Sequence, residues 1–314
     1  MKTLILKINS KNPEIDRIAT AGKIIKKGGL VAFPTETVYG LGANALDVTA
    51  VRKIFEAKGR PNDNPLIVHI ANKGDLNKLA RDIPEIANRL ISKFWPGPLT
   101  LVLKKNKIVP DEVTAGLDTV AIRMPNKGIA LALIGESGPI AAPSANLSGK
   151  PSGTSINHVI HDFNGKIDCI IDGGDADIGL ESTVLDLTSN PIAILRPGKI
   201  TFEQLRKIIP NLIVSSSVKG EVRSPGMKYK HYSPRAKVII ANSIGDIDKI
   251  RKINEGRKIK VIDISDNDLL AKRLFTFFRE ADDENCDIVI VKAVEEKGFG
   301  RAIMNRLRKA SSKD

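Results

Sequence analysis

The segment 213–235, IVSSSVKGEVRSPGMKYKHYSPR, limits the possible folds of this chain more than any other stretch. It is rich in serine, proline, glycine and positive charge, and it has no amphipathic period. The pattern predicts a basic linker between two separately packed units. The 314 residues then divide into a domain of residues 1–212 and a second domain of residues 236–314, both of ordinary domain size.

Residues 1–212 mix short apolar runs with amphipathic stretches in no regular order. The predicted strands are Leu4–Ile8, Leu30–Pro34, Leu66–Ile70, Leu99–Leu103, Val120–Met124, Ile140–Ala142, Ile167–Ile171, Thr183–Leu187 and Ile192–Leu195. One helix is predicted to begin after an Asn12 cap and to end at Gly28, and a second to run from an Asp47 cap to Ala57. Because strands and helices do not alternate cleanly, we expect one large α/β domain with a mixed sheet rather than a doubly wound fold.

Residues 236–314 follow a different, regular pattern. Strands are predicted at Lys237–Ala241, Lys260–Ile264 and Ile288–Val291, each followed by an amphipathic helix. This β-α-β-α-β-α order predicts a small parallel sheet with right-handed crossovers.

Composition favours a soluble enzyme of the cytoplasm. No apolar run approaches the roughly 20 residues that span a bilayer, so no membrane association is expected. Cys169 and Cys286 are expected to be buried, reduced thiols rather than a disulfide or metal site. The net charge of +13 suggests a nucleic acid partner, but residues 205–235 alone carry 7 basic and 1 acidic side chains. The excess is therefore local, not a broad basic face.

Polar loops follow several of the predicted strands. The loop Pro34–Gly42 is dense in hydroxyl groups and glycine, and Lys58–Pro65 places two cations two residues apart on a stretch that prolines keep out of a helix. The loop Ala141–Gly149 offers small residues beside Ser144 and Asn146. Such loops suit a polyanionic substrate that approaches the backbone closely.

Four cations occupy strand ends or rigid loops of the first domain: Lys58, Arg60, Arg123 and Arg196. They suit a triphosphate and a carboxylate, because arginine binds both in a bidentate manner. The chain has neither a G-x-x-x-x-G-K-[ST] loop nor a G-x-G-x-x-G fingerprint. From the residues alone, we expect a phosphate- or nucleotide-using enzyme without a Walker loop.

Several of these motifs together resemble the Sua5/YrdC family. They are Pro34–Gly42, the K-x-R of 58–60, the S-x-N of 144–146, Glu181–Val184 and the linker run Ser224–Pro234. The linker run is similar to that of the two-domain Sua5 branch. The resemblance implies a YrdC-type domain, an open twisted mixed sheet with a deep cleft, followed by a small Rossmann-like parallel α/β domain.

The resemblance also implies an activity, threonylcarbamoyl-AMP synthase. Such an enzyme joins L-threonine, bicarbonate or CO2 and ATP into threonylcarbamoyl-adenylate and pyrophosphate, the first step of t6A modification of tRNA. Mg2+ would enter with the ATP phosphates, with no metal ligands from the protein, and a downstream transferase would use the product.

Site residues carry over from the family by position. The catalytic residues implied are Lys58, Arg60, Ser144 and Asn146. The ATP contacts implied are Arg60, Asn64, Thr119, Ser144, Ser152, Arg196 and Tyr232. The threonine contacts implied are Thr35, His69, Arg123 and Ser182, with Thr37 an open alternative to Thr35. Tyr232 would let the linker cover the cleft and shield the adenylate from water.

Two other functions compete with this one. A double-stranded RNA-binding protein without catalysis would use a concave basic surface, but aromatic residues are only 4% and the charge excess is local. Weak RNA binding beside catalysis stays open. A carbamoyl transferase of hydrogenase maturation shares this domain type, but two cysteines cannot form its zinc fingers. The sequence leaves open the oligomeric state, the role of the second domain and whether bicarbonate or CO2 reacts.

Overall fold

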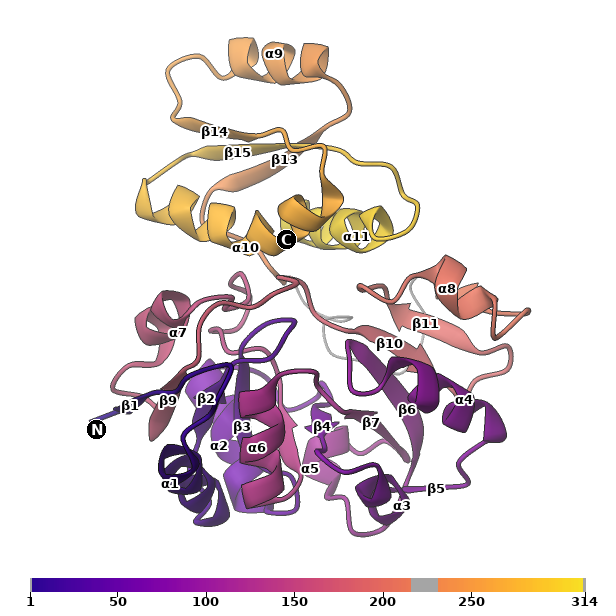
Figure 1. Ribbon diagram of the computed structural model, residues 1–314. Helices are drawn as coiled ribbons and strands as arrows, with labels where there is room; N and C mark the ends of the chain where they lie inside the picture. Colours follow the sequence, from indigo (N-terminus) through magenta and orange to yellow (C-terminus); the bar gives the residue numbers. More distant parts are fainter. Residues whose placement is uncertain (1, 216–230, 313–314) are drawn as a thin grey trace.

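The computed structural model describes residues 2–215 and 231–312, which form two sheets with helices packed around them (Figure 1). Twelve strands of these residues form the large sheet, in the order β1-β9-β2-β3-β8-β4-β7-β6-β10-β11-β12, and β5 pairs with β6. They are β1 (Leu4–Lys7), β2 (Val31–Phe33), β3 (Gly40–Asn44), β4 (Ile67–His69), β5 (Ala80–Arg81), β6 (Leu99–Lys105), β7 (Thr119–Arg123), β8 (Ile140–Ala142), β9 (Cys169–Asp172), β10 (Thr183–Asp186), β11 (Ala193–Arg196) and β12 (Ile213–Val214).

The helices of this domain lie on both faces of the large sheet. They are α1 (Ile15–Lys26), α2 (Val48–Lys58), α3 (Leu76–Leu79), α4 (Glu85–Phe94), α5 (Asp111–Thr114), α6 (Gly128–Ser137), α7 (Ile156–Phe163) and α8 (Phe202–Arg206), with a 3-10 turn at Lys73–Asp75. Parallel pairs such as β4–β7 and β6–β10 stand beside antiparallel pairs such as β2–β3 and β6–β7. The expected mixed α/β sheet is confirmed. The pairing of β12 with β11 extends this sheet to residue 214, just inside the predicted linker.

The alternation of side chains along the strands decides where a site can form. On β2, Ala32 joins the apolar cluster packed under α2 and α4, whereas Val31 and Phe33 join the cluster under α1 and α6. The latter face continues over β4 and β7, where Ile67 and Ala121 pack in a small separate cluster. His69 and Arg123 point to the same face as Ile67 and Ala121, and Ile67, His69 and Arg123 line the pocket described below.

Three details differ from the sequence prediction. Residues 40–42 begin strand β3 instead of completing a loop. Glycine at position 42 allows β3 to pair with β8, because a Cβ there would lie 2.6 Å from Ile140 Cγ2 of β8. The predicted Asn12 cap is wrong, since α1 begins at Ile15 and Glu14 precedes it. Lys58 belongs to the last turn of α2, which ends at Gly59 with a φ of 59°.

The Asp47 cap is confirmed, because its carboxylate accepts hydrogen bonds from the backbone N–H groups of Thr49 and Ala50. Both cysteines are buried and free, as expected. Within the described residues, no helix combines the length and apolarity needed to cross a membrane.

The C-terminal domain is a three-stranded parallel sheet, in the order β13-β15-β14, as its alternating pattern predicts. Its elements are β13 (Lys237–Ala241), α9 (Ile244–Ile253), β14 (Ile259–Ile262), α10 (Asn267–Asp283), β15 (Ile288–Lys292) and α11 (Gly300–Ser311). Figure 1 shows α9 on the outer face and α10 and α11 on the face toward the large domain. Helices α10 and α11 therefore carry the contacts between the domains.

Candidate active site

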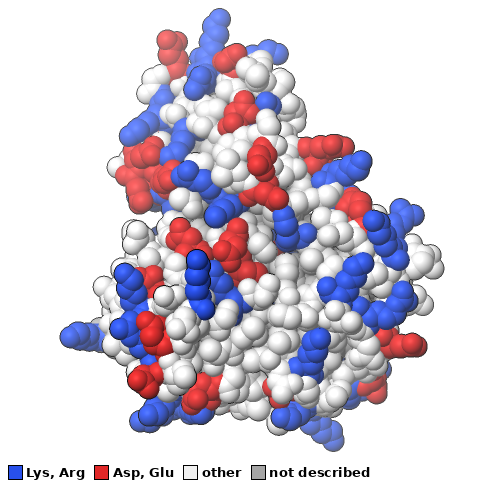
Figure 2. Space-filling model, in the orientation of Figure 1, with Lys and Arg blue, Asp and Glu red and all other residues white. Residues whose placement is uncertain are grey.

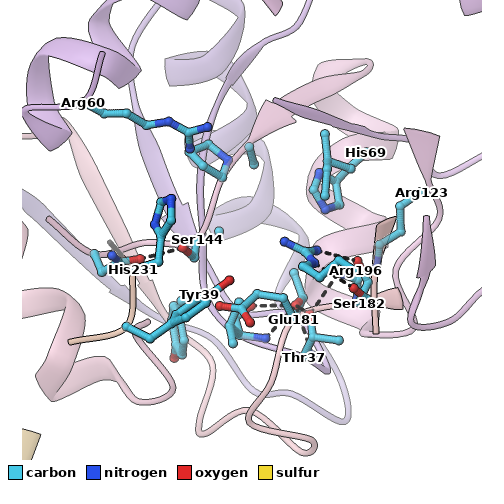
Figure 3. A pocket seen from close by; sticks show the side chains of 18 of the residues that line it. Thr37, Tyr39, Arg60, His69, Arg123, Ser144, Glu181, Ser182, Arg196 and His231 are labelled. Carbon is cyan, nitrogen blue, oxygen red and sulfur yellow. Dashed lines mark hydrogen bonds between the residues drawn. The ribbon is translucent and has the colours of Figure 1, made fainter. Parts of the chain in front are cut away.

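One pocket collects most of the predicted site residues (Figure 3). The predicted residues that line it are Thr35, Arg60, His69, Arg123, Ser144, Asn146, Ser182, Arg196 and Tyr232. The alternative Thr37 lines it too. Residues from eight separate stretches of the chain therefore meet in one place.

Four predicted residues do not line this pocket: Lys58, Asn64, Thr119 and Ser152. Thr119 lies at the opposite end of β7 from Arg123, four residues along an extended strand, or about 13 Å. Ser152 is buried and donates to the carboxylate of Glu181 at 2.5 Å. The predicted nucleotide contacts of Thr119 and Ser152 therefore gain no support from the geometry.

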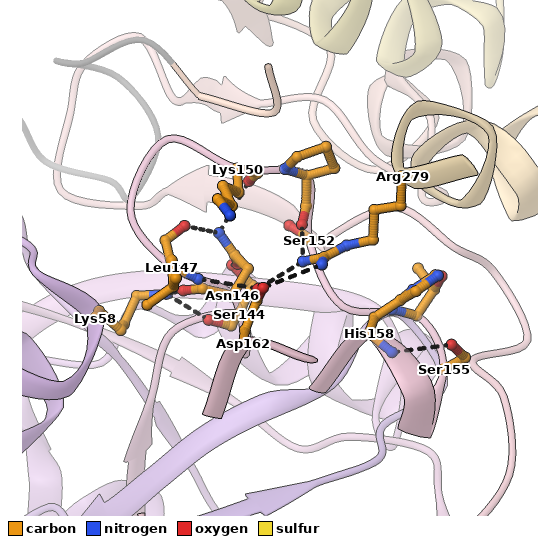
Figure 4. A network of polar contacts seen from close by, with 12 residues as sticks. Lys58, Ser144, Asn146, Leu147, Lys150, Ser152, Ser155, His158, Asp162 and Arg279 are labelled. Carbon is orange, nitrogen blue, oxygen red and sulfur yellow. Dashed lines mark hydrogen bonds and ion pairs between the residues drawn. The ribbon is translucent and has the colours of Figure 1, made fainter. Parts of the chain in front are cut away.

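Lys58 has a definite partner other than a ligand. Its ammonium donates to the backbone carbonyls of Ser144, at 2.7 Å, and of Asn146 (Figure 4). Burial, with Arg60 nearby, lowers the Lys58 pKa well below its ordinary value. Ser144 in turn donates to Asn146 Oδ1 at 2.6 Å. Lys58 thus holds the loop that presents Ser144 and Asn146, and these two face the pocket.

Arg60 and Asn64 carry unsatisfied polar groups. Arg60 donates to the carbonyls of Asn64 and Pro65 at 2.9 and 3.3 Å, but its Nε–H has no partner. Burial lowers the Arg60 pKa to about 10, so it stays charged at neutral pH. The Asn64 side chain is fully buried, and neither its oxygen nor its nitrogen is hydrogen-bonded. Native proteins seldom leave such groups unpaired, so Arg60, which lines the pocket, is a candidate to bind a ligand through its Nε–H.

Arg123 has an ionic partner within the chain, Glu36, at 2.7 Å. Its guanidinium also donates to Thr37 Oγ1 at 2.9 Å and to the Gly97 carbonyl at 3.3 Å. The sequence indicated an anionic partner for Arg123 but not that Glu36 supplies it. A guanidinium has five N–H groups, and Thr37 and Gly97 accept from two of them, so terminal N–H groups are left for a further acceptor such as a carboxylate.

The geometry separates Thr35 from Thr37. The Thr35 hydroxyl donates to the Val38 carbonyl at 2.6 Å and accepts from the backbone N–H groups of Thr37 and Val38. It is therefore committed to its own turn. The Thr37 hydroxyl lies 2.9 Å from that of Thr35 and accepts from Arg123, which leaves one of its three hydrogen-bonding positions for a ligand.

Ser182 and Arg196 form one hydrogen-bonded unit beside Arg123. Arg196 donates to the Ser182 carbonyl at 3.0 Å and to the Ser182 hydroxyl at 3.1 Å. That hydroxyl also pairs with the hydroxyl of Thr100 at 2.8 Å. Burial lowers the pKa of Arg196 from its ordinary value. The unit presents a hydroxyl and a cation at a fixed spacing.

Residues next to the linker close the pocket on the side of the second domain. His231 and Tyr232 both line it, and Tyr232 stacks on Phe275 of α10 with ring centres 5.3 Å apart. Tyr232 has a φ of 67°, a left-handed conformation rare for a bulky residue. Positions 216–230 of the predicted linker 213–235 lie outside the described residues.

Further lining residues were not predicted from the sequence: Tyr39, Lys150, Glu181 and His231. Two signals were present. Glu181 directly precedes Ser182 in a quoted motif, and His231 directly precedes Tyr232. Neither residue type indicates a role without its partners in space.

Two histidines of the pocket should make the protein acid-sensitive. Burial, with Arg123 nearby, lowers the His69 pKa to about 3, and burial with Arg60 lowers that of His231 to about 3. The unfolded chain binds protons near pH 6.5 whereas the native state does not, so stability falls as pH drops below 6.5. At pH 5 the expected loss is about 2 kcal/mol per histidine.

Urea unfolding between pH 7.5 and 5 measures this loss. His69→Gln should flatten the dependence by about one histidine's share, while His161→Gln, on the outer helix α7, should leave it unchanged. An equal slope in wild type and His69→Gln would contradict the assignment.

Comparisons with known proteins agree with this geometry. A family model described as "Telomere recombination" (Sua5, YciO and YrdC) matches residues 23–198. A second, described as "Threonylcarbamoyl-AMP synthase, C-terminal domain", matches residues 200–312. Threonylcarbamoyl-AMP synthase of Pyrococcus abyssi is 50% identical, covering 98% of both chains, and that of Bacillus subtilis is 45% identical, covering 94% of this chain and 93% of the relative.

Solved structures give the same relationship. The crystal structure of Pyrococcus abyssi Sua5 complexed with L-threonine superposes with a TM-score of 0.94 at 50% identity, covering 98% of both chains. Escherichia coli YciO, at 27% identity and a TM-score of 0.56, covers 62% of this chain and 95% of its own. The first similarity spans both domains and the second only part of the chain. This chain therefore belongs to the Sua5/YrdC family, and within it to the two-domain Sua5 type.

Proposed function

We propose that this chain synthesises threonylcarbamoyl-AMP from L-threonine, bicarbonate or CO2 and ATP, with release of pyrophosphate. The observation that carries this proposal is the division of one pocket into two ends. One end holds Thr37, His69, Arg123 and Ser182, and the other holds Arg60, Ser144 and Asn146 (Figure 3). A relative that shares the fold over nearly its whole length was solved with L-threonine.

The first end suits a small amino acid. The unused N–H groups of Arg123 would bind the carboxylate, and the remaining hydrogen-bonding position of the Thr37 hydroxyl would meet the amino group. His69 is neutral at pH 7, because burial holds its pKa near 3, and its Nδ1 has no partner. A neutral imidazole can hydrogen-bond the threonine side chain without repelling its ammonium group.

The second end suits the phosphates of ATP. The Nε–H of Arg60 is a donor without an acceptor among the described residues, and Arg60 lines the pocket. Ser144 and Asn146 stand at fixed positions because Lys58 binds their loop. We treat Mg2+ as part of the ATP substrate, since phosphate oxygens and water complete its octahedral shell. Among the described residues, Glu181 is the acidic side chain that lines the pocket, and it is already bound by Ser152 and Arg306.

The chemistry requires placement rather than a covalent intermediate. The threonine amine attacks CO2 and loses a proton, which gives a carbamate. A carbamate oxygen then attacks the α-phosphorus of ATP, and the bond to pyrophosphate breaks. Both steps depend on orientation and on neutralised phosphate charge, which the Arg60 end would supply. The product is a mixed anhydride, so we infer that a transferase uses it at once, in the cytoplasm, to modify tRNA to t6A.

Nothing in the described residues favours RNA binding as the main function. Figure 2 shows basic and acidic side chains interspersed over the visible face, without a continuous basic surface. Several basic side chains are buried and therefore not available to an RNA surface, among them Lys58, Arg123 and Arg196. Direct tRNA binding as a secondary property stays a prediction to test.

The decisive experiment measures pyrophosphate. The protein is incubated with Mg-ATP and bicarbonate, with and without L-threonine, and the adenylate is identified by mass spectrometry. We expect release to depend on threonine and to fall when bicarbonate and CO2 are removed. L-Valine, which lacks the hydroxyl, and D-threonine are the matched controls. Release that is the same without L-threonine would reject the proposed function.

A further inference from the structure

The loop of residues 177–182, here called the Glu181 loop, joins the pocket to both domains. On one side its backbone N–H groups are bonded to the first domain: Asp177 and Ile178 donate to the Glu36 carbonyl, and Gly179 donates to that of Thr37. The loop therefore sets the backbone at Thr37 directly. Its last residue, Ser182, enters the pocket.

The other side of the Glu181 loop packs against the second domain without free space. Leu180 is fully buried in the apolar cluster of α10 and α11. Gly179 has a φ of 84°, and a Cβ there would lie 2.5 Å from the Ala271 carbonyl oxygen of α10. Any movement of α10 toward the loop is therefore transmitted to it.

Arg306 of α11 is the polar part of this contact, and its side chain is fully buried. Its Nε donates to Glu181 Oε2 at 2.9 Å, and its Nη1 donates to the Pro197 carbonyl at 3.0 Å. The guanidinium lies over the ring of Tyr232, 5.4 Å from its centre. Burial raises the Glu181 pKa, but Arg306 and Arg196 outweigh it and keep the carboxyl ionised.

The two partners of Arg306 have a specific relation to the pocket. Glu181 immediately precedes Ser182, and Pro197 immediately follows Arg196. Ser182 lies at the threonine end, and Arg196, a predicted ATP contact, is hydrogen-bonded to it. One side chain of the second domain thus binds the neighbours of both members of the pair.

We propose that Arg306 is a positioning residue for the threonine end of the pocket, which makes the second domain part of the active site. This rests on the proposed function, since the readout is threonine-dependent catalysis. Among the described residues, Arg306 has no hydrogen bond or ion pair to Arg60, Asn64, Ser144 or Asn146, and its contact on the nucleotide side is the ring of Tyr232. Its loss should therefore affect threonine far more than ATP.

The experiment compares steady-state kinetics of the full chain and its Arg306 variants. We expect Arg306→Ala to raise the KM for L-threonine about tenfold or more, and that for ATP less than about threefold. Arg306→Lys keeps the charge but cannot reach Glu181 and Pro197 together, so it should recover only part of the loss. The matched control is Arg301→Ala, because Arg301 also lies on α11 and pairs across the domains with Glu203 at 3.3 Å, away from the pocket. It should leave both constants unchanged.

Folding is controlled separately. Arg306→Ala leaves the buried Glu181 carboxylate without its partner, and removal of one member of a buried ion pair commonly destabilises a protein strongly. Arg306→Met with Glu181→Gln removes the charge imbalance. We expect this double variant to fold and still to show the threonine-specific rise.

The outcomes distinguish the two proposals. An equal rise of the KM for L-threonine and of that for ATP in Arg306→Ala would overturn the positioning role. A rise of the same size in the KM for L-threonine of Arg301→Ala would overturn it too. A wild-type protein without threonine-dependent release would reject the proposed function instead. Titration calorimetry with L-threonine alone gives a second readout, where Arg306→Ala should weaken binding about tenfold, and unchanged binding would again overturn the positioning role.

Discussion

Arg60→Ala should lower the rate of adenylate formation by about a hundredfold or more while the protein stays folded. Arg60 is a cation that lines the phosphate end with a donor still unpaired, and its hydrogen bonds within the described residues go to the carbonyls of Asn64 and Pro65. The charge that develops on the leaving pyrophosphate would then lose its nearest fixed cation. Pyrophosphate release at saturating substrates measures the effect.

Two matched variants test whether the lower rate of Arg60→Ala comes from the loss of its guanidinium. Arg60→Lys keeps the charge but loses the planar fork, so we expect an intermediate rate. Arg52→Ala removes an exposed arginine of α2, paired with Glu112 at 2.6 Å, and should leave the rate unchanged. A wild-type rate in Arg60→Ala would remove Arg60 from the proposed site.

Arg123→Met should both destabilise the protein and abolish threonine use. It would leave Glu36 buried without its ionic partner, and such a loss typically costs about 3–5 kcal/mol of unfolding free energy. It also removes the guanidinium proposed to bind the substrate carboxylate. Urea unfolding reports the first effect, and the KM for L-threonine reports the second.

The double variant Glu36→Gln with Arg123→Met separates stability from activity. Without the unpaired charge, most of the stability should return, but threonine use should not. The exposed pair of Lys26 and Glu136 is the control, and Lys26→Ala should cost less than about 1 kcal/mol. Recovery of activity in the double variant would show that Arg123 is structural only.

Local sequence patterns predicted most helices and strands, and they failed where contacts between distant residues determine the local structure. The regular order of residues 236–314 predicted the parallel sheet correctly, because apolar residues there recur at the spacing typical of each strand and each helix. Strand β3 was missed since glycine lowers strand propensity, while in the folded sheet Gly42 is required by Ile140. The Asn12 cap failed because Glu14 precedes the first turn instead, its carboxylate accepting from the Asn9 N–H.

The site was predicted as a set of residues, but not as a set of contacts. Composition and spacing indicated that Arg123 needs an anion, yet only the tertiary fold brings Glu36 to it across 87 positions of sequence. Lys58 belonged to a recognised motif, and its partners turned out to be the carbonyls of another motif, Ser144 and Asn146. Sequence motifs thus name the participants, and long-range packing decides which of them face the ligand.

The place of α11 in the chain has a consequence for biosynthesis. The strands of the large sheet are complete once residue 214 has been made, so this domain can fold while translation continues. The ion pair of Glu181 with Arg306 must wait for the last helix, which ends at Ser311. A nascent chain in which α11 has not yet packed would therefore carry an almost complete pocket without the ion pair of Glu181 and Arg306, and the enzyme would become competent only once α11 is in place.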